Sequence, residues 1–334
     1  MLPSNLARPV HQRAFPARRR ALVLGAFVLG MLAACSGHGA PTGGKPRVVV
    51  IPKGTTHVFW KAVEKGARDA ALERGLELVW KGPLAENDRA QQIQLVQQFV
   101  AEKPAGLALA PLDHAALVPA VAAARAAGIP VVVFDSALDG GAPRDFASFV
   151  ATDNAAGGKL AGEELARLLG GAGDVVLLRY LVGSASTEAR EAGFLESIRA
   201  HGAKVLVENR YAGATIGEAK TTALNLADQL KQAKGVFASN EPATNGMLLA
   251  LRQLGLAGRV KFVGFDASPP LVEALKQGEI DALVVQNPRK MGALTVAALA
   301  DLLEKKTPPT AIDTGAVLVT RENMNRPEVA ALLE

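Results

Sequence analysis

The sequence predicts an α/β fold built as two doubly wound parallel-sheet lobes. Short apolar runs, typical of strands covered on both faces, alternate with amphipathic stretches typical of helices. This alternation requires right-handed crossovers and a parallel sheet. It occurs in two successive series, the second starting after Asp153, which favours two sheets over one large sheet. An eight-fold α/β barrel is the main alternative, because the length of the chain permits it.

The first series begins with a continuous Val-Val-Val-Ile run over residues 48–51, as expected of a buried strand. Apolar and small residues then recur three and four positions apart from Phe59 to Ala71, which indicates one face of a helix that ends near Gly75. The same patterns predict further strands over 76–80, 106–110 and 129–134, and helices over 89–101 and 115–127.

The second series follows Asp153 and repeats the same alternation. It predicts helices over 155–169, 187–201, 217–230, 243–254 and 271–277, and strands over 174–179, 204–207, 235–238, 260–265 and 282–285. A last helix over 291–303 keeps its apolar residues three and four apart.

The N-terminus predicts an export signal. Five arginines and no acidic residue occur in the first 34 residues, and an apolar run over 21–34 is shorter than the about 20 residues that span a bilayer. Cys35, the only cysteine, follows Leu32, Ala33 and Ala34, in the order of bacterial lipoprotein signals. We therefore expect a signal peptide over 1–34, a lipid on Cys35 and a flexible Gly-rich tether over 35–45.

The excess of positive charge belongs to this signal. The chain has 37 basic and 32 acidic residues, and without the five signal arginines the basic residues also number 32. The high pI therefore does not indicate a nucleic-acid partner. The histidines lack metal-ligand spacing, and phosphate-loop and nucleophile-elbow patterns are absent from the sequence. We expect no metal, no cofactor and no enzymatic activity.

Two predicted strands end in the same dipeptide. Residues 131–135 read VVVFD and residues 260–266 read VKFVGFD, so that Asp135 and Asp266 each follow a buried strand. Ligands of open α/β sheets bind at this carboxyl edge. If the lobes face each other, both carboxylates approach one cleft. The alternative is that each Asp caps a turn or the next helix.

Other side chains are expected beside the same cleft. Asn240 and Gln286 also follow strands, and amides and carboxylates bind hydroxyls at fixed angles. Phe59 and Trp60 would supply an aromatic wall for the C–H faces of a ligand. Phe59 lies on the apolar stripe of its helix and alternatively packs in the core. Trp60 lies off that stripe and is the better ligand candidate.

A charged site is a further alternative. Lys53, His57 and Arg89 would bind an anionic group if they converge. Otherwise Lys53 and Arg89 are solvated loop charges, and His57 either donates to a ligand or starts a helix.

Several short segments occur in one order along the chain. They are 57–60 with Gly66 and Ala67, 129–135, 152–154 with Gly157 and Gly158, 186–188 with Arg190, Gly193 and Phe194, 237–240, 263–266, and Gln286 before Met291 and Gly292. In this order they resemble bacterial periplasmic sugar-binding proteins of the ribose-binding type, over nearly all of residues 46–334.

This resemblance implies a type I periplasmic-binding fold with a three-crossing hinge. It implies an N-terminal lobe of residues 46–151 and 287–314 and a C-terminal lobe of residues 152–286 and 315–334. Together, the resemblance and the strand-end pattern predict eight ligand-binding residues: His57, Phe59, Trp60, Asp135, Arg190, Asn240, Asp266 and Gln286. His57 stands where ribose binders have an asparagine, which leaves the identity of the sugar open.

We therefore expect an extracytoplasmic, monomeric solute-binding protein, anchored to a membrane through Cys35. It would capture a sugar or polyol and deliver it to the permease of an ABC transporter. Two alternatives are a sensory protein that presents a sugar-like signal to a receptor and, less favoured, a glycosidase using the paired aspartates. A transcription regulator of this fold would need DNA-binding helices where the signal lies.

Overall fold

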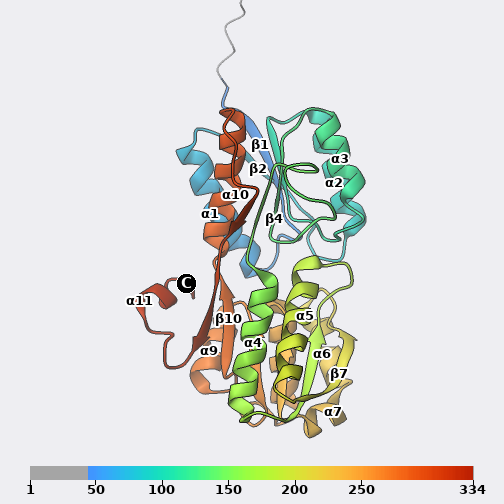
Figure 1. The fold of residues 1–334 in the computed structure, drawn as a ribbon, viewed down its shortest axis with the longest axis vertical. Coiled ribbons are helices and arrows are strands. Elements are labelled where there is room, and N and C mark those ends of the chain that lie inside the picture. The colour runs from blue at the N-terminus through green and yellow to red at the C-terminus, as the bar shows by residue number, and fades with distance from the viewer. Residues whose placement is uncertain (1–43, 334) are drawn as a thin grey trace, which may run out of the picture. The chain divides into compact units, whose positions relative to one another are not determined.

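The computed structural model describes residues 44–333. The predicted signal peptide and Cys35 lie outside these residues. From residue 45 onward the chain forms two lobes, each with one six-stranded sheet between two layers of helices (Figure 1). Within the described residues, every helix is too short or too polar to cross a bilayer.

The first sheet has the strand order β11-β5-β4-β3-β1-β2, and all its neighbouring strands are parallel. Its strands are β1 (Arg47–Ile51), β2 (Glu77–Trp80), β3 (Gly106–Leu109), β4 (Val131–Phe134), β5 (Ser148–Ala151) and β11 (Ala311–Asp313). One face packs on α1 (Val58–Glu73) and α10 (Pro288–Leu303), and the other on α2 (Arg89–Glu102) and α3 (Val118–Ala126).

The second sheet has the corresponding order β12-β10-β9-β8-β6-β7. Its strands are β6 (Asp174–Arg179), β7 (Lys204–Tyr211), β8 (Gly235–Ala238), β9 (Lys261–Phe265), β10 (Ala282–Gln286) and β12 (Ala316–Thr320). One face packs on α4 (Asn154–Leu169) and α5 (Ala185–Ala200). The helices of the opposite layer and the C-terminal helix are α6 (Ile216–Leu224), α7 (Ala227–Gln232), α8 (Glu241–Gln253), α9 (Pro269–Gln277) and α11 (Pro327–Ala330).

The two sheets confirm the predicted pair of doubly wound lobes and rule out a single barrel. In each sheet the strand order reverses direction at one point, between β1 and β3 and between β6 and β8. Ligands of open α/β sheets bind outside the carboxyl ends of the strands at such switch points. The chain passes between the lobes three times, after β5, after β10 and after β11.

Some local predictions were wrong. β12 runs antiparallel to β10, so the second sheet is not purely parallel. The patterns did not reveal the short strands β5, β11 and β12, because none is a long apolar run between two amphipathic helices. The helix predicted over 217–230 is two helices, since the chain leaves the helical conformation at Leu226, where φ is −101° and ψ is 19°.

Close packing of α4 on α5 depends on two glycines. A Cβ atom at Gly158 would lie 1.9 Å from the carbonyl oxygen of Arg190, and one at Gly193 would lie 2.2 Å from that of Ala155. Larger residues would therefore push the two helices apart. This contact holds Arg190 beside Asn154 at the start of α4, where Arg190 Nε donates to Asn154 Oδ1 at 2.8 Å.

Candidate functional site

Asp135 and Asp266 occupy matching positions directly after β4 and β9. Both have left-handed backbones, with φ of 61° and 69°, a conformation that Asp tolerates better than most residues. Each N–H donates to the neighbouring strand, that of Asp135 to Val150 O at 2.9 Å and that of Asp266 to Val284 O at 2.8 Å. Strained backbones of this kind often occur at functional sites. The structure brings both carboxylates to one cavity between the lobes.

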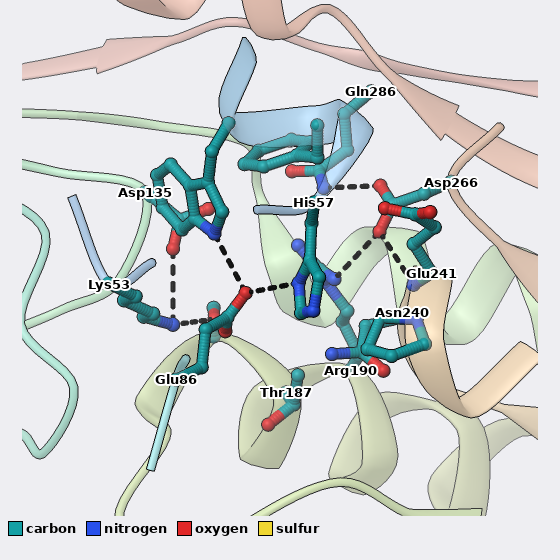
Figure 2. A pocket seen from close by; sticks show the side chains of 14 residues that line it. Lys53, His57, Glu86, Asp135, Thr187, Arg190, Asn240, Glu241, Asp266 and Gln286 are labelled. Atoms are coloured by element: carbon teal, nitrogen blue, oxygen red, sulfur yellow. Dashed lines mark hydrogen bonds and ion pairs between the residues drawn. The ribbon is translucent and has the colours of Figure 1, made fainter. Parts of the chain in front are cut away.

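This polar cavity is narrow, because its own side chains leave a free volume of only about 30 Å³. All eight side chains that the sequence proposed as ligand-binding line it, as do six others (Figure 2). The eight are His57, Phe59, Trp60, Asp135, Arg190, Asn240, Asp266 and Gln286, and the six are Lys53, Glu86, Ser186, Thr187, Glu241 and Pro242.

Lys53, which follows β1, is buried in the cavity and is not a solvated loop charge. Its Nζ lies 3.1 Å from Asp135 Oδ2 and donates to Ser186 Oγ at 2.9 Å and to Ser184 Oγ at 3.3 Å. Asp135 belongs to the first lobe and both serines to the second, so the ammonium group bridges the lobes. These partners compensate the loss of water around the buried charge.

Glu86, in the loop between β2 and α2, was not predicted from the sequence. Its Oε1 accepts from Trp60 Nε1 at 2.7 Å and lies 2.8 Å from His57 Nδ1. Burial acts to raise the pKa of Glu86, but His57, Lys53 and Trp60 together hold this pKa below its usual value. For His57 the effects are reversed: burial acts to lower its pKa, but the hydrogen bond with Glu86 and the nearby carboxylates raise it more. Both shifts favour the charged forms and therefore an ion pair between His57 and Glu86.

The two aromatic residues differ from the sequence-based interpretation. Trp60 is only 2 % exposed and belongs to the core of the first lobe, so placing it off the buried stripe was wrong. It makes edge-to-face contacts with Phe134 and Phe59, at ring-centroid distances of 6.2 and 5.0 Å. Burial is tolerated because Glu86 accepts the indole N–H. Phe59 is half-buried and keeps more of its ring accessible at the cavity.

Asp266 is held by groups of the second lobe. Its Oδ1 accepts from Gln286 Nε2 at 2.7 Å, and its Oδ2 accepts from the backbone N–H of Glu241 at 3.1 Å. Arg190 Nη1 lies 4.0 Å from the same Oδ2. Burial raises the pKa of Asp266; the charge of Arg190 opposes this effect, and Asp135 reinforces it. The carboxylate is therefore desolvated and oriented by three neighbours.

Arg190 is a buried guanidinium group fixed on three sides. Besides Asn154, it donates from Nη1 to the carbonyl oxygen of Ser239 at 3.1 Å, and it lies over the ring of Phe265 with 3.9 Å between Cζ and the ring centroid. Burial lowers the pKa of Arg190, and the carboxylates of the cavity act against that effect. A planar donor fixed in this way suits recognition of oxygen acceptors.

Glu241, the first residue of α8, reaches toward the other lobe. Its Oε2 is buried and has no hydrogen-bond partner among the described residues. Burial raises the pKa of Glu241 to about 7; His57 and the backbone N–H of Phe59 lower it, whereas Asp266 raises it further. The N-terminus of α1 has no side-chain cap of its own. Glu241 therefore faces the open end of a helix that belongs to the opposite lobe.

The anionic-group alternative is not supported, because Arg89 lies outside the polar cavity and the other two basic residues already have carboxylate partners. Arg89 Nη1 lies 2.5 Å from Asp113 Oδ2 and does not line the polar cavity. Lys53 is paired with Asp135 and His57 with Glu86. His57 directly precedes α1 and also lines the polar cavity. No cluster of potential metal ligands is found within residues 44–333.

The chain is similar to proteins of known structure and function. Residues 48–307 match a family model described as a periplasmic binding protein domain. The D-ribose/D-allose-binding protein of Pseudomonas aeruginosa is 31% identical over 274 residues, which cover 80% of this chain and 86% of that protein. An ABC transporter solute-binding protein from Agrobacterium vitis, solved with bound D-fucose, has 36% identity and a TM-score of 0.83, covering 86% of this chain and 100% of its own. A carbohydrate transporter solute-binding protein from Agrobacterium radiobacter, in complex with D-arabinose, has 33% identity and a TM-score of 0.83, covering 87% of this chain and 99% of its own.

Proposed function

The chain belongs to the periplasmic binding protein family, and we propose that it binds a monosaccharide or related polyol between its lobes and delivers it to an ABC transporter permease. The polar cavity carries this proposal, because strand ends of both sheets contribute carboxylate, amide and guanidinium groups to it. Such groups bind hydroxyls at fixed angles, and Phe59 offers a flat apolar surface. Relatives that bind D-ribose, D-allose, D-fucose or D-arabinose support this class of ligand.

The charges of the cavity favour a neutral ligand. Lys53 and His57 each have a carboxylate partner within about hydrogen-bond distance, and Arg190 faces Asp266. An incoming phosphate would have to compete with these carboxylates for every cation. A hydroxyl group, in contrast, can donate to a carboxylate and accept from a cation without breaking the charge balance.

Closure couples binding to delivery. Asp135 and Asp266 belong to different lobes, so a ligand that contacts both favours the closed arrangement over the open one. We propose that the permease recognises the surface formed by the closed lobes and thereby distinguishes the loaded protein from the empty one.

The proposal includes that the ligand is released unchanged. Asp135 is engaged by Lys53, and Asp266 accepts from Gln286 and from the backbone of Glu241. Both carboxylates are thus held as hydrogen-bonding groups. A glycosidase would need one of them as a proton donor and the other free to attack or to activate water.

A panel of ligands tests the function. In a thermal-shift assay of residues 45–334, D-ribose, D-allose, D-fucose or D-arabinose at 100 times its Kd should stabilise the native state by about 2.7 kcal/mol. D-Ribose 5-phosphate and amino acids should give no shift. A panel in which no neutral sugar or polyol raises the melting temperature, or in which only the phosphorylated sugar does so, would contradict the proposal.

We also propose that the protein is tethered to a membrane through a lipid on Cys35, after removal of residues 1–34. The order of arginines, apolar run and cysteine supports this proposal. Radiolabelled fatty acid supplied to cells should label the unchanged protein, and Cys35→Ser should remove this label while leaving sugar binding unchanged. Equal labelling of both forms, or no label in either, would exclude the anchor.

A further inference from the structure

A second cavity, of about 110 Å³, lies against the polar cavity. The start of α1, the segment between β9 and α9, the end of β10 and the C-terminal segment form its walls. We call this space the apolar annex; its lining residues are Val58, Phe59, Ala62, Asp266, Ala267, Ser268, Pro269, Val285, Gln286, Pro288, Leu332 and Leu333.

The two cavities have opposite character. The polar cavity is lined by seven side chains that titrate or carry charge: Lys53, His57, Glu86, Asp135, Arg190, Glu241 and Asp266. Among the described residues that line the annex, only Asp266 is charged, and it belongs to both linings. The rest of the annex is largely aliphatic, with the ring of Phe59 at one side.

Three residues line both spaces and separate them: Phe59, Asp266 and Gln286. Asp266 and Gln286 are joined by a hydrogen bond of 2.7 Å and present polar groups. Phe59 packs against the core of the first lobe but is only half-buried, and it lines both cavities. A molecule bound against the Phe59 ring therefore has hydrogen-bonding groups on one side and apolar surface on the other.

From this arrangement we propose that the protein accepts sugars bearing an apolar substituent, such as alkyl or aryl glycosides, with the substituent in the annex. The inference rests on the proposed binding of a sugar in the polar cavity. Burying each additional methylene group contributes about 0.8 kcal/mol, so two of them already correspond to about a tenfold gain in affinity. The walls come from both lobes, so the substituent would also favour closure.

Isothermal titration calorimetry tests this proposal. The probes are free D-ribose, D-allose and D-fucose, and both anomers of their methyl, butyl and phenyl glycosides. We expect the butyl or phenyl glycoside of one anomer to bind at least tenfold more tightly than the free sugar. Ala62→Phe should remove this gain by filling the annex, while the free sugar keeps its affinity within about threefold. Val58→Trp, at a more exposed position of the same wall, is a second filling variant.

Lys65→Phe is the matched control, because Lys65 is exposed on the same helix and lines neither cavity. It should retain the gain. The annex proposal would be overturned if free sugars bind but their glycosides bind no better, or if the gain survives both filling variants. Either result would leave the proposed function intact. If neither the free nor the substituted sugars bind, the proposed function fails and the annex proposal fails with it.

Discussion

Replacing Asp266 with alanine is expected to weaken sugar binding by at least about thirtyfold. Asp266 offers two oxygens at the boundary of the cavity, oriented by Gln286 and by the backbone of Glu241. Its loss removes acceptors for ligand hydroxyls and leaves the buried guanidinium of Arg190 without its nearest cavity carboxylate, 4.0 Å away. Truncating one partner of a buried charged contact typically costs about 2–5 kcal/mol, which corresponds to a loss of 30-fold to several thousandfold.

Calorimetry with the sugar selected by the thermal-shift panel measures this effect. Asp266→Asn keeps the shape and one acceptor, and should lose less affinity than Asp266→Ala. Asp228→Ala, which removes an exposed carboxylate of α7, is the control and should bind as the unchanged protein does. An Asp266→Ala protein with a normal melting temperature and unchanged affinity would remove Asp266 from the binding site.

The position of Asp266 could be predicted because it depends on a simple rule. Parallel strands end at one edge of a sheet, so a polar residue directly after a buried strand lies at that edge. Asp135 and Asp266 follow their strands directly, Asn240 lies two residues after β8, and Gln286 is the last residue of β10. The structure places all four at the polar cavity. The lobes could be predicted for the same reason, since strand and helix periodicity are local properties.

Residues that depend on contacts across the fold could not be predicted in this way. Glu86 lies in a loop that no periodicity describes, and its role follows from its distances to His57 and Trp60. Trp60 is buried because Glu86 accepts its indole N–H. Lys53 follows a strand just as Asp135 does, but an isolated lysine is usually solvated. Only the facing carboxylate and serines explain its burial.

Closure of the two lobes is expected to change the pKa of Glu241. In the structure, where both lobes line the polar cavity, it faces His57 at the start of α1, Asp266 after β9 and Glu86 before α2, and its Oε2 lacks a hydrogen-bond partner among the described residues. Opening the lobes would expose this carboxyl to water and return its pKa toward the ordinary value of 4.5. Closure therefore favours the protonated form, because burial and the two nearby carboxylates raise the pKa of Glu241 to about 7.

Sugar affinity is therefore expected to fall as pH rises. An acid whose pKa is higher in the closed state takes up a proton on closure, so the closed state loses stability between the open-state pKa of about 4.5 and the closed-state pKa of about 7. Above about pH 7 the closed state loses no further stability from this group. With these two pKa values, the uptake of one proton on closure predicts that sugar affinity falls by roughly one to two orders of magnitude between pH 5 and pH 8. Burial lowers the pKa of His57, but Glu86 and, from the other lobe, Asp266 raise it, so His57 acts in the same direction.

Glu191 provides the contrast that makes this prediction specific. Burial also raises the pKa of Glu191 to about 7, but its hydrogen-bond partners, Tyr180 N–H and Ser239 Oγ, belong to its own lobe. Its titration should therefore be the same in the open and closed states and should not affect ligand binding.

Calorimetry from pH 5 to pH 8 separates the two carboxyls. Glu241→Gln should reduce the slope of affinity against pH to less than half, and His57→Gln in the same background should remove most of the remainder. Glu191→Gln should leave the slope unchanged. A flat profile in the unchanged protein, or a slope that survives Glu241→Gln intact, would show that closure does not change the pKa of Glu241 and would place this residue outside the closing interface.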